Sequence, residues 1–156
     1  MEAENFIYIV ALTFLPGLEL RASIPYALLI SNSNLFFIPI ILLLNIILGE
    51  AVFYFLNTSL DFFLKINVFK KYYLKYIKRI QKRARKYVDK YGTLGLAIFI
   101  GIPLPGSGVY TGALAAFILG FERRDFSKAN ILGVLISGIA VTLIVLSGCR
   151  IFNLKI

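Results

Sequence analysis

The sequence predicts an all-α integral membrane protein built from two inverted units, and three observations lead to this prediction. Of the 156 residues, 59% are hydrophobic and only 16% are charged, and the mean hydropathy of +0.82 lies far outside the range of soluble domains. The chain contains apolar runs long enough to cross a bilayer. Two of these runs are broken in the middle and two are whole, in alternating order.

The four apolar segments cover residues 6–30, 35–56, 93–121 and 131–148. The second segment is whole and, as a helix, would be about 33 Å long, which spans a bilayer core of about 30 Å with a modest tilt. The fourth segment is also continuous. The first is interrupted by PGLELRASIP and the third by GIPLPGSG. Proline and glycine stop or kink helices, so each broken segment should form two short helices.

Broken segments in corresponding positions of two halves are typical of transporters with inverted repeats. A shift of 89 residues also places the Leu-Pro-Gly of 15–17 on the Leu-Pro-Gly of 104–106, although few other positions match. We therefore predict a single membrane domain, 1–156, in which 1–57 and 93–156 are the two repeats.

Residues 58–92 join the repeats and are typical of a basic amphipathic helix. Eleven of the 17 Lys and Arg residues lie between Lys65 and Lys90. Apolar residues recur at spacings of three and four, namely Phe62, Ile66, Phe69, Tyr73, Ile77, Ile80, Ala84, Tyr87 and Tyr91. The other face is basic, with Lys70, Lys71, Lys75, Lys78, Arg79, Lys82, Arg83, Arg85 and Lys86.

This basic segment sets the expected orientation in the cell membrane. The positive-inside rule places residues 57–92 in the cytoplasm. The helix would then lie on anionic lipids, or would serve only as a basic linker, and the two interpretations are about equally supported. Nucleic-acid binding ranks below both, because basicity alone is weak evidence beside membrane segments.

Two topologies agree with this orientation. In one, each broken segment is a re-entrant helical hairpin and each unit ends in one transmembrane helix. In the other, the broken segments span, which gives four crossings. Both topologies place almost the same number of Lys and Arg residues on the cytoplasmic side, so the positive-inside rule does not choose between them. We favour the hairpins, because two prolines or a charged pair at mid-depth suit a hairpin tip better than a spanning helix.

Three ionisable residues stand inside apolar sequence: Glu19 and Arg21 in the first break, and Glu50 in the first whole helix. Ionisable groups at membrane depth are costly, so they are functional candidates by default. We expect Glu19 or Glu50 to carry a coupling proton. The alternatives are a structural salt bridge between Glu19 and Arg21, a position at the interface for this pair, and a Glu50 carboxylate that reaches the headgroups.

The second break predicts a site for an anion. Freed backbone amides at helix starts attract negative groups, and Arg21 would strengthen such a site. The expected substrate-binding residues are Arg21, Gly106, Ser107, Gly108, Tyr110 and Thr111. If the hairpin tips meet, the turn would face Arg21 across a small cavity, and Glu19 would compete for Arg21 when the site is empty.

The glycines of this region have a second interpretation. Gly108 and Gly112 form a GxxxG pair, and Gly133 with Ser137 forms another small-xxx-small pair. Such pairs let transmembrane helices approach closely. We expect both packing and binding to use them.

Several function classes are excluded. The chain has no histidine, and its one cysteine, Cys149, has no partner within the chain, so zinc sites and internal disulfides are not expected. There is no nucleophile elbow and no P-loop lysine. We therefore expect no enzymatic activity, no metal and no cofactor.

Three stretches carry a family resemblance: FLPGLELRASIPYAL at 14–28, the Gly-Glu of NIILGE, and GIPLPGSGVYTGALAA at 101–116. Together they resemble the prokaryotic small multi-drug export protein family, whose name implies drug efflux. More distantly, the arrangement is similar to DedA-type membrane proteins, which have two re-entrant hairpins and are implicated in proton-linked lipid transport, including that of polyprenyl phosphate carriers.

The DedA similarity implies that Glu19 and Glu50 take the part of the family's acidic residues and Arg21 that of a phosphate-binding arginine. The second hairpin here has no arginine, since Arg123 and Arg124 lie beyond its end. This departure speaks against a phosphate clamp made of two arginines.

Together these observations predict a secondary transporter or flippase for an amphiphilic, anionic, lipid-phosphate-like substrate, coupled to protons or ions. An exporter of hydrophobic drugs and a non-transporting membrane scaffold are the alternatives. The expected partners are membrane lipids, the small amphiphilic substrate and a second copy of the chain in a homodimer.

Overall fold

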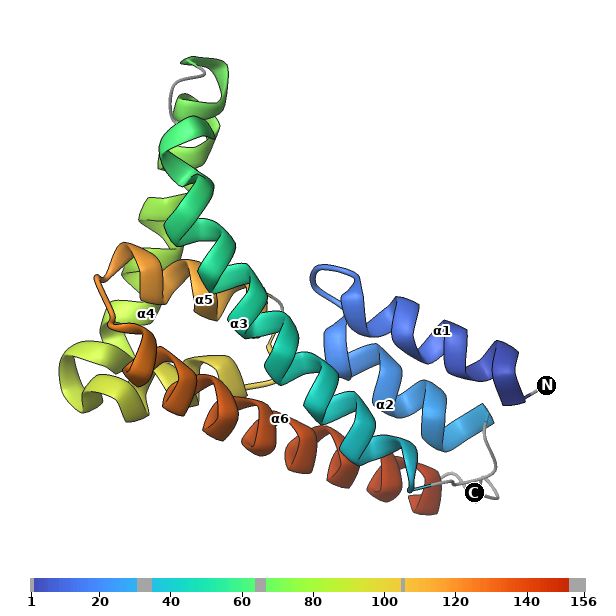
Figure 1. The fold of residues 1–156 in the computed structure, drawn as a ribbon. Coiled ribbons are helices and arrows are strands. Elements are labelled where there is room, and N and C mark those ends of the chain that lie inside the picture. The colour runs from blue at the N-terminus through green and yellow to red at the C-terminus, as the bar shows by residue number, and fades with distance from the viewer. Residues whose placement is uncertain (1, 31–34, 64–66, 105, 152–156) are drawn as a thin grey trace.

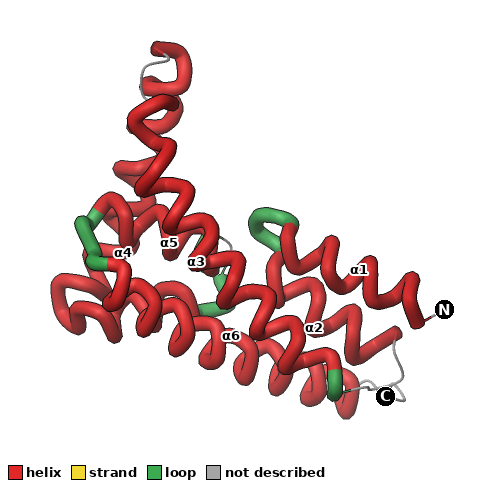
Figure 2. The backbone as a smooth tube through the Cα atoms, in the orientation of Figure 1, coloured by secondary structure: helices red, strands yellow, loops and turns green. Residues whose placement is uncertain are grey.

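The computed structural model describes residues 2–30, 35–63, 67–104 and 106–151, and within these ranges it contains helices and no strands. Figures 1 and 2 show long helices joined by short turns. The helices are α1 (Glu2–Phe14), α2 (Glu19–Ile30), α3 (Phe37–Phe63), α4 (Asn67–Gly101), α5 (Val109–Ile118) and α6 (Arg123–Ile151). The prediction of an all-helical chain is confirmed.

Helices α1 and α2 lie side by side and form a helical hairpin (Figure 1). Gly17 has a φ of +87°, a left-handed conformation that favours glycine. The amide of Glu19 donates to the carbonyl of Leu15 at 3.2 Å and closes the turn. Helix α2 then begins at Glu19, so the break is shorter than expected.

Pro25 lies inside α2, and the expectation that it helps to interrupt the segment is wrong. A proline removes one backbone hydrogen bond, but a helix can continue when packing supports both sides of it. Ile24 and Ala27 beside it are fully buried. Tertiary packing therefore outweighs the local preference here.

The two long apolar helices are α3 and α6. Phe37–Thr58 within α3 and the helix α6 are long enough to cross a membrane, and each contains an 18-residue apolar stretch, with mean hydropathies of 2.2 and 2.5. Helix α3 begins two residues inside the predicted run 35–56 and continues past its end, and α6 extends beyond the run 131–148 at both ends.

Glycines bring α3 and α6 close together. A Cβ atom on Gly49 would stand 2.5 Å from the side-chain oxygen of Asn130, and one on Gly138 would stand 2.3 Å from a methyl carbon of Leu42. Neither position has room for a side chain. The small residues thus permit close packing, as they do in other membrane helix pairs.

Helix α4 reverses direction at Gly92, whose φ of 55° and ψ of −127° are not helical. A Cβ atom on Gly95 would lie only 2.0 Å from the carbonyl oxygen of Tyr87, so the chain after Gly92 folds back tightly on the chain before it. The rings of Tyr87 and Phe99 consequently lie 6.4 Å apart, centroid to centroid. This reversal brings the basic part of α4 next to the second break.

The first part of α4 contains most of the predicted amphipathic segment. Ile80 and Ala84 are buried, Tyr87 is half-buried and Tyr91 is exposed, so the apolar face is confirmed for the first three. The helix begins at Asn67, later than the expected start at residue 58. The remaining predicted positions of both faces, up to residue 79, fall outside the described side chains.

The second break follows Gly101, and α5 begins at Val109. Helix packing around the break uses the predicted small residues. A Cβ atom on Gly112 would lie 2.3 Å from Ile100 Cγ1, and one on Gly133 would lie 2.6 Å from Ile100 Cβ. The close-packing interpretation of these glycines is confirmed. The inverted relation of the two halves and the re-entry of the hairpins remain predictions.

Candidate functional site

The tip of the first hairpin meets the second break, and Arg21 makes three hydrogen bonds in this contact. Its guanidinium donates from Nη1 to the carbonyl oxygen of Leu104. The other terminal nitrogen, Nη2, donates to the carbonyl oxygen of Ile102 at 3.2 Å and to Ser107 Oγ at 2.8 Å. Arg21 thus adds hydrogen bonds to two carbonyl groups of the turn after α4, which also accept bonds from the amides of Leu104 and Ser107.

Glu19 holds the other side of the break. Its carboxylate accepts hydrogen bonds from the backbone amides of Val109 at 3.1 Å and Tyr110 at 3.4 Å, the first two residues of α5. Glu19 is 3% exposed as a residue. Its own φ of 48° is unusual for a residue other than glycine. The tight turn at Gly17 and this conformation together direct the carboxylate to α5.

The two charges therefore complement the two helix ends. The start of a helix carries partial positive charge and its end carries partial negative charge. The Glu19 carboxylate lies at the start of α5, and the Arg21 guanidinium lies at the carbonyl groups after α4. The alternative of a salt bridge between Glu19 and Arg21 is not the arrangement found among the described residues, because each charge has separate partners on the break.

The remaining predicted binding residues lie in or beside this contact. The hydroxyl of Ser107 lies 2.6 Å from the carbonyl oxygen of Ile102 and 2.7 Å from that of Leu104. Tyr110 donates its hydroxyl to the carbonyl oxygen of Phe14 at 2.6 Å, which adds a second link to the first hairpin. Thr111 makes a local hydrogen bond, to the carbonyl oxygen of Gly108 at 3.3 Å.

Two glycines are required by this geometry. Gly108 has a φ of 118°, and a Cβ atom there would lie 2.3 Å from Glu19 Oε2. Gly106 has a φ of 80° and faces Arg83. The first glycine admits the carboxylate to the amides of α5, so the amides expected to bind a substrate anion are occupied by Glu19 in this structure.

Glu50 belongs to a separate polar cluster between α3 and α6. It accepts a hydrogen bond from the hydroxyl of Ser127 at 3.0 Å, and the amide nitrogen of Asn130 lies 3.5 Å from its other oxygen. Asn130 also donates to the carbonyl oxygen of Ile46 at 2.9 Å. Glu50 is half-buried and Asn130 is fully buried.

The sequence interpretation missed Ser127 and Asn130. The available sequence signal was the position of Asn130 at the edge of the last apolar segment. That Asn130 lies beside the Gly-Glu of the first whole helix is evident only from the fold. Asn130 Oδ1 has no hydrogen-bond partner in the described part of the chain. The neighbouring Gly49 leaves the room that the Asn130 side chain occupies.

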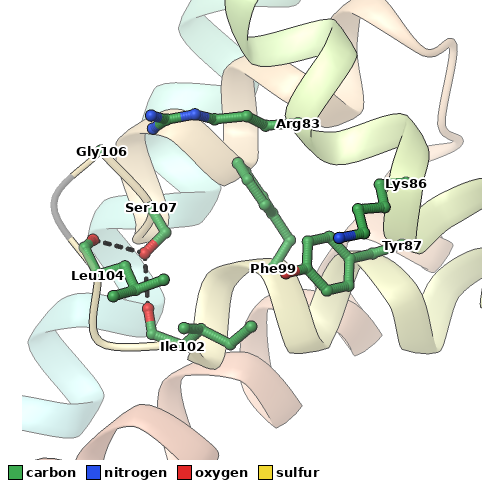
Figure 3. Close-up of a pocket in the computed structure, with 8 residues that line it drawn as sticks. All are labelled: Arg83, Lys86, Tyr87, Phe99, Ile102, Leu104, Gly106 and Ser107. Carbon is green, nitrogen blue, oxygen red and sulfur yellow. Dashed lines mark hydrogen bonds between the residues drawn. The ribbon is translucent and has the colours of Figure 1, made fainter.

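A cavity of 430 Å³ adjoins the second break (Figure 3). It is lined by Arg83, Lys86, Tyr87, Phe99, Ile102, Leu104, Gly106 and Ser107. Leu104 and Ser107 also bind Arg21, so the cavity and the contact between the hairpins share a wall. The sequence placed Arg83 and Lys86 on the basic face but could not place that face beside the break.

Comparison with protein families gives one match: the family described as "Putative small multi-drug export protein" matches residues 19–140. The matched range begins at Glu19, after the turn of the first break, and includes the charged pair, Glu50, the second break and the cavity residues. Searches among curated proteins and among solved structures gave no match.

Proposed function

Because the chain belongs to the small multi-drug export protein family, we propose that it is a secondary transporter of small amphiphilic molecules that bear an anionic group. In this proposal the two broken segments are re-entrant hairpins, and α3 and α6 are the spanning helices. The basic part of α4 lies at the cytoplasmic face of the cell membrane, in keeping with the positive-inside rule.

One observation carries the proposal: a charged pair from one hairpin, the buried Glu19 and the half-buried Arg21, meets both ends of a broken helix in the other. Discontinuous helices of transporters supply binding sites at their free ends. Here Arg21 and Glu19 hold those ends in the present arrangement. A change in either side chain's partners would release backbone groups beside the cavity, where a substrate could engage them.

The proposal gives the coupling proton to Glu19 or Glu50. Protonation of Glu19 would remove the negative charge that the start of α5 stabilises, and would weaken the contact with Val109 and Tyr110. Protonation of Glu50 would change the cluster with Ser127 at the contact between α3 and α6. Either step would alter how the two halves pack.

Two other functions compete. The family description favours export of hydrophobic drugs, which would need no anionic group on the substrate. A membrane scaffold would use the hairpins only for packing and the basic helix as a partner surface. The Arg83 and Lys86 side chains in the cavity lining favour an anionic substrate over a cationic drug.

Transport by the purified protein in liposomes is the deciding experiment. We expect uptake of an anionic amphiphile to depend on an imposed proton gradient, and Glu19→Gln or Glu50→Gln to abolish that dependence while the protein remains folded. A scaffold would transport nothing under any gradient. Preferential uptake of cationic dyes would instead support the drug exporter.

Topology is tested separately with single cysteines in a Cys149→Ser background. If the first segment is re-entrant, cysteines at Glu4 and Leu35 should react with an impermeant reagent from the same side of the membrane. Reaction from opposite sides would show that the segment spans. Ser33, a second useful position, lies outside the described residues.

A further inference from the structure

We propose that the cavity beside the second break binds the anionic group of the substrate through Arg83 and Lys86, with the turn at Gly106 and Ser107 as its rim. The inference rests on the proposed function only where it calls the ligand a transported substrate, because binding to the cavity can be measured without transport. It names the substrate class as a small amphiphile with one phosphate, sulfonate or carboxylate group.

Two cations face this cavity without a competing acid. Arg83 and Lys86 stand three residues apart on α4 and therefore share a helix face. The lining contains no aspartate or glutamate. Neither cation has an ion-pair or hydrogen-bond partner within the described ranges of the chain. An anion entering the cavity would therefore not have to displace a carboxylate from either cation.

The guanidinium of Arg83 points toward the turn (Figure 3). A Cβ atom on Gly106 would stand 3.2 Å from Arg83 Nη1, so glycine keeps open the space into which the guanidinium extends. The hydroxyl of Ser107 lies on the same rim. The Ser107 hydroxyl already donates to a backbone carbonyl, so the donors for a tetrahedral or planar anion are the planar guanidinium of Arg83 and the flexible ammonium of Lys86.

The rest of the lining is apolar and partly aromatic. Tyr87, Phe99, Ile102 and Leu104 contribute rings and aliphatic surface. A volume of 430 Å³ falls in the range of sites for small organic ligands, about 300 to 1,000 Å³. The ligand should thus combine its anionic group with an aromatic or short aliphatic body.

The wall of the cavity connects it to the charged pair. Leu104 and Ser107 line the cavity and are also bound by Arg21. An anion close to Ser107 would attract the Arg21 guanidinium, which would loosen its bonds to the carbonyl groups of the break. Occupation of the cavity would in this way reach the contact between the two hairpins.

The test uses three probes with one aromatic body and different charges: 1-naphthyl phosphate, 1-naphthol and 1-naphthylmethylammonium. Their binding is measured by titration calorimetry on the full chain in nanodiscs of zwitterionic lipid. We expect the phosphate to bind at least roughly tenfold more tightly than the other two. The hydrogen bonds from Arg83 and Lys86 to a charged phosphate contribute enough free energy for a difference of that size. Tighter binding of the ammonium probe, or equal binding of all three, would overturn the proposal.

Matched variants on the same helix locate the site. Arg83→Gln and Lys86→Gln should each weaken naphthyl phosphate roughly tenfold. Arg85→Gln and Lys82→Gln remove the same charges from positions that are exposed like Arg83 and Lys86 but lie outside the lining, and should change binding less than about twofold. Equal weakening by all four variants would show a diffuse attraction to the basic helix and would refute the cavity site.

Competition separates two sources of the anion. Displacement of naphthyl phosphate by dihexanoyl phosphatidate, but not by dihexanoyl phosphatidylcholine, would identify a lipid headgroup as the occupant. Displacement by neither would leave a soluble amphiphile as the occupant. Site-specific binding without transport in liposomes would keep this inference and refute the transporter. Transport that is unaffected by Arg83→Gln would support the transporter and refute this inference.

Discussion

The two polar centres of this protein use ionisable side chains in different ways. At the second break, Glu19 and Arg21 bind backbone groups: amides at the start of α5 and carbonyls after the end of α4. Between α3 and α6, Glu50 binds side chains, chiefly the Ser127 hydroxyl.

The difference follows from the continuity of the helices. An unbroken helix satisfies its own backbone, so Glu50 between α3 and α6 bonds to side chains, and only Asn130 of this cluster also reaches a backbone carbonyl, that of Ile46. A broken helix leaves amides and carbonyls free, and in apolar surroundings each unsatisfied group costs several kcal/mol. Charges at the tip of the first hairpin are thus part of what makes the second break stable. The comparison predicts that changes at the break should cost more stability than changes at Glu50.

Replacement of Arg21 should have the largest effect. Arg21→Met removes bonds to two carbonyl groups and to Ser107, and should lower the free energy of unfolding by about 3 kcal/mol or more. Reversible unfolding in mixed micelles measures this. Arg124→Met, at an exposed position, is the control and should stay within about 0.5 kcal/mol. Equal losses would refute a structural role for the Arg21 contacts.

Glu19→Gln should come next. The amide side chain can still accept one backbone hydrogen bond, but it loses the charge and brings donors toward the donors of Val109 and Tyr110. We expect a loss of about 2 kcal/mol by the same unfolding measurement. A stability equal to that of the parent would show that α5 does not need the carboxylate at its start.

Gly49→Ala tests the other centre through packing. The added methyl group would meet the Asn130 side chain at 2.5 Å, which forces α3 and α6 apart and should cost about 1 to 2 kcal/mol. Gly148→Ala is the matched control, because a Cβ atom there meets nothing within 4 Å. That variant should be neutral or more stable by up to about 1 kcal/mol. Equal free energies of unfolding for the two variants would show that α3 and α6 do not approach closely at Gly49 and Asn130.

Glu50→Gln should have the smallest effect on stability. Glutamine keeps an oxygen that can accept the Ser127 hydroxyl, so the loss should be under about 1 kcal/mol. Its effect on proton-dependent transport should nevertheless be large if Glu50 carries the proton. A loss of stability larger than that of Glu19→Gln would reverse the ranking of the two centres.

Local sequence predicted most of the helices and both breaks. Proline and glycine near residue 16 and over 101–108 marked the interruptions, and hydropathy marked α3 and α6. Pro25 misled, because buried neighbours keep α2 helical around it. Helix breaks and apolar runs are determined by residues that are close together in the chain, so a single sequence shows them directly.

The site was less predictable, because its contacts join residues far apart in the chain. Arg21 and Glu19 were identified as candidates, but their partners on the break depend on how the two hairpins meet. Arg83 and Lys86 looked like any other basic residues of the linker. Only the reversal at Gly92 places them beside the second break, and no local pattern specifies where a reversed helix will pack.

The central claim is that the first hairpin's tip holds the second break, and a double-mutant cycle between Arg21 and Ser107 tests it most directly. The two side chains are 2.8 Å apart, Nη2 to Oγ, so Arg21→Met and Ser107→Ala should show a coupling energy of about 1 kcal/mol or more. The same cycle between Arg21 and Ser127, which belongs to the other centre, should give no coupling beyond about 0.5 kcal/mol. Additive effects of Arg21→Met and Ser107→Ala would contradict the claim.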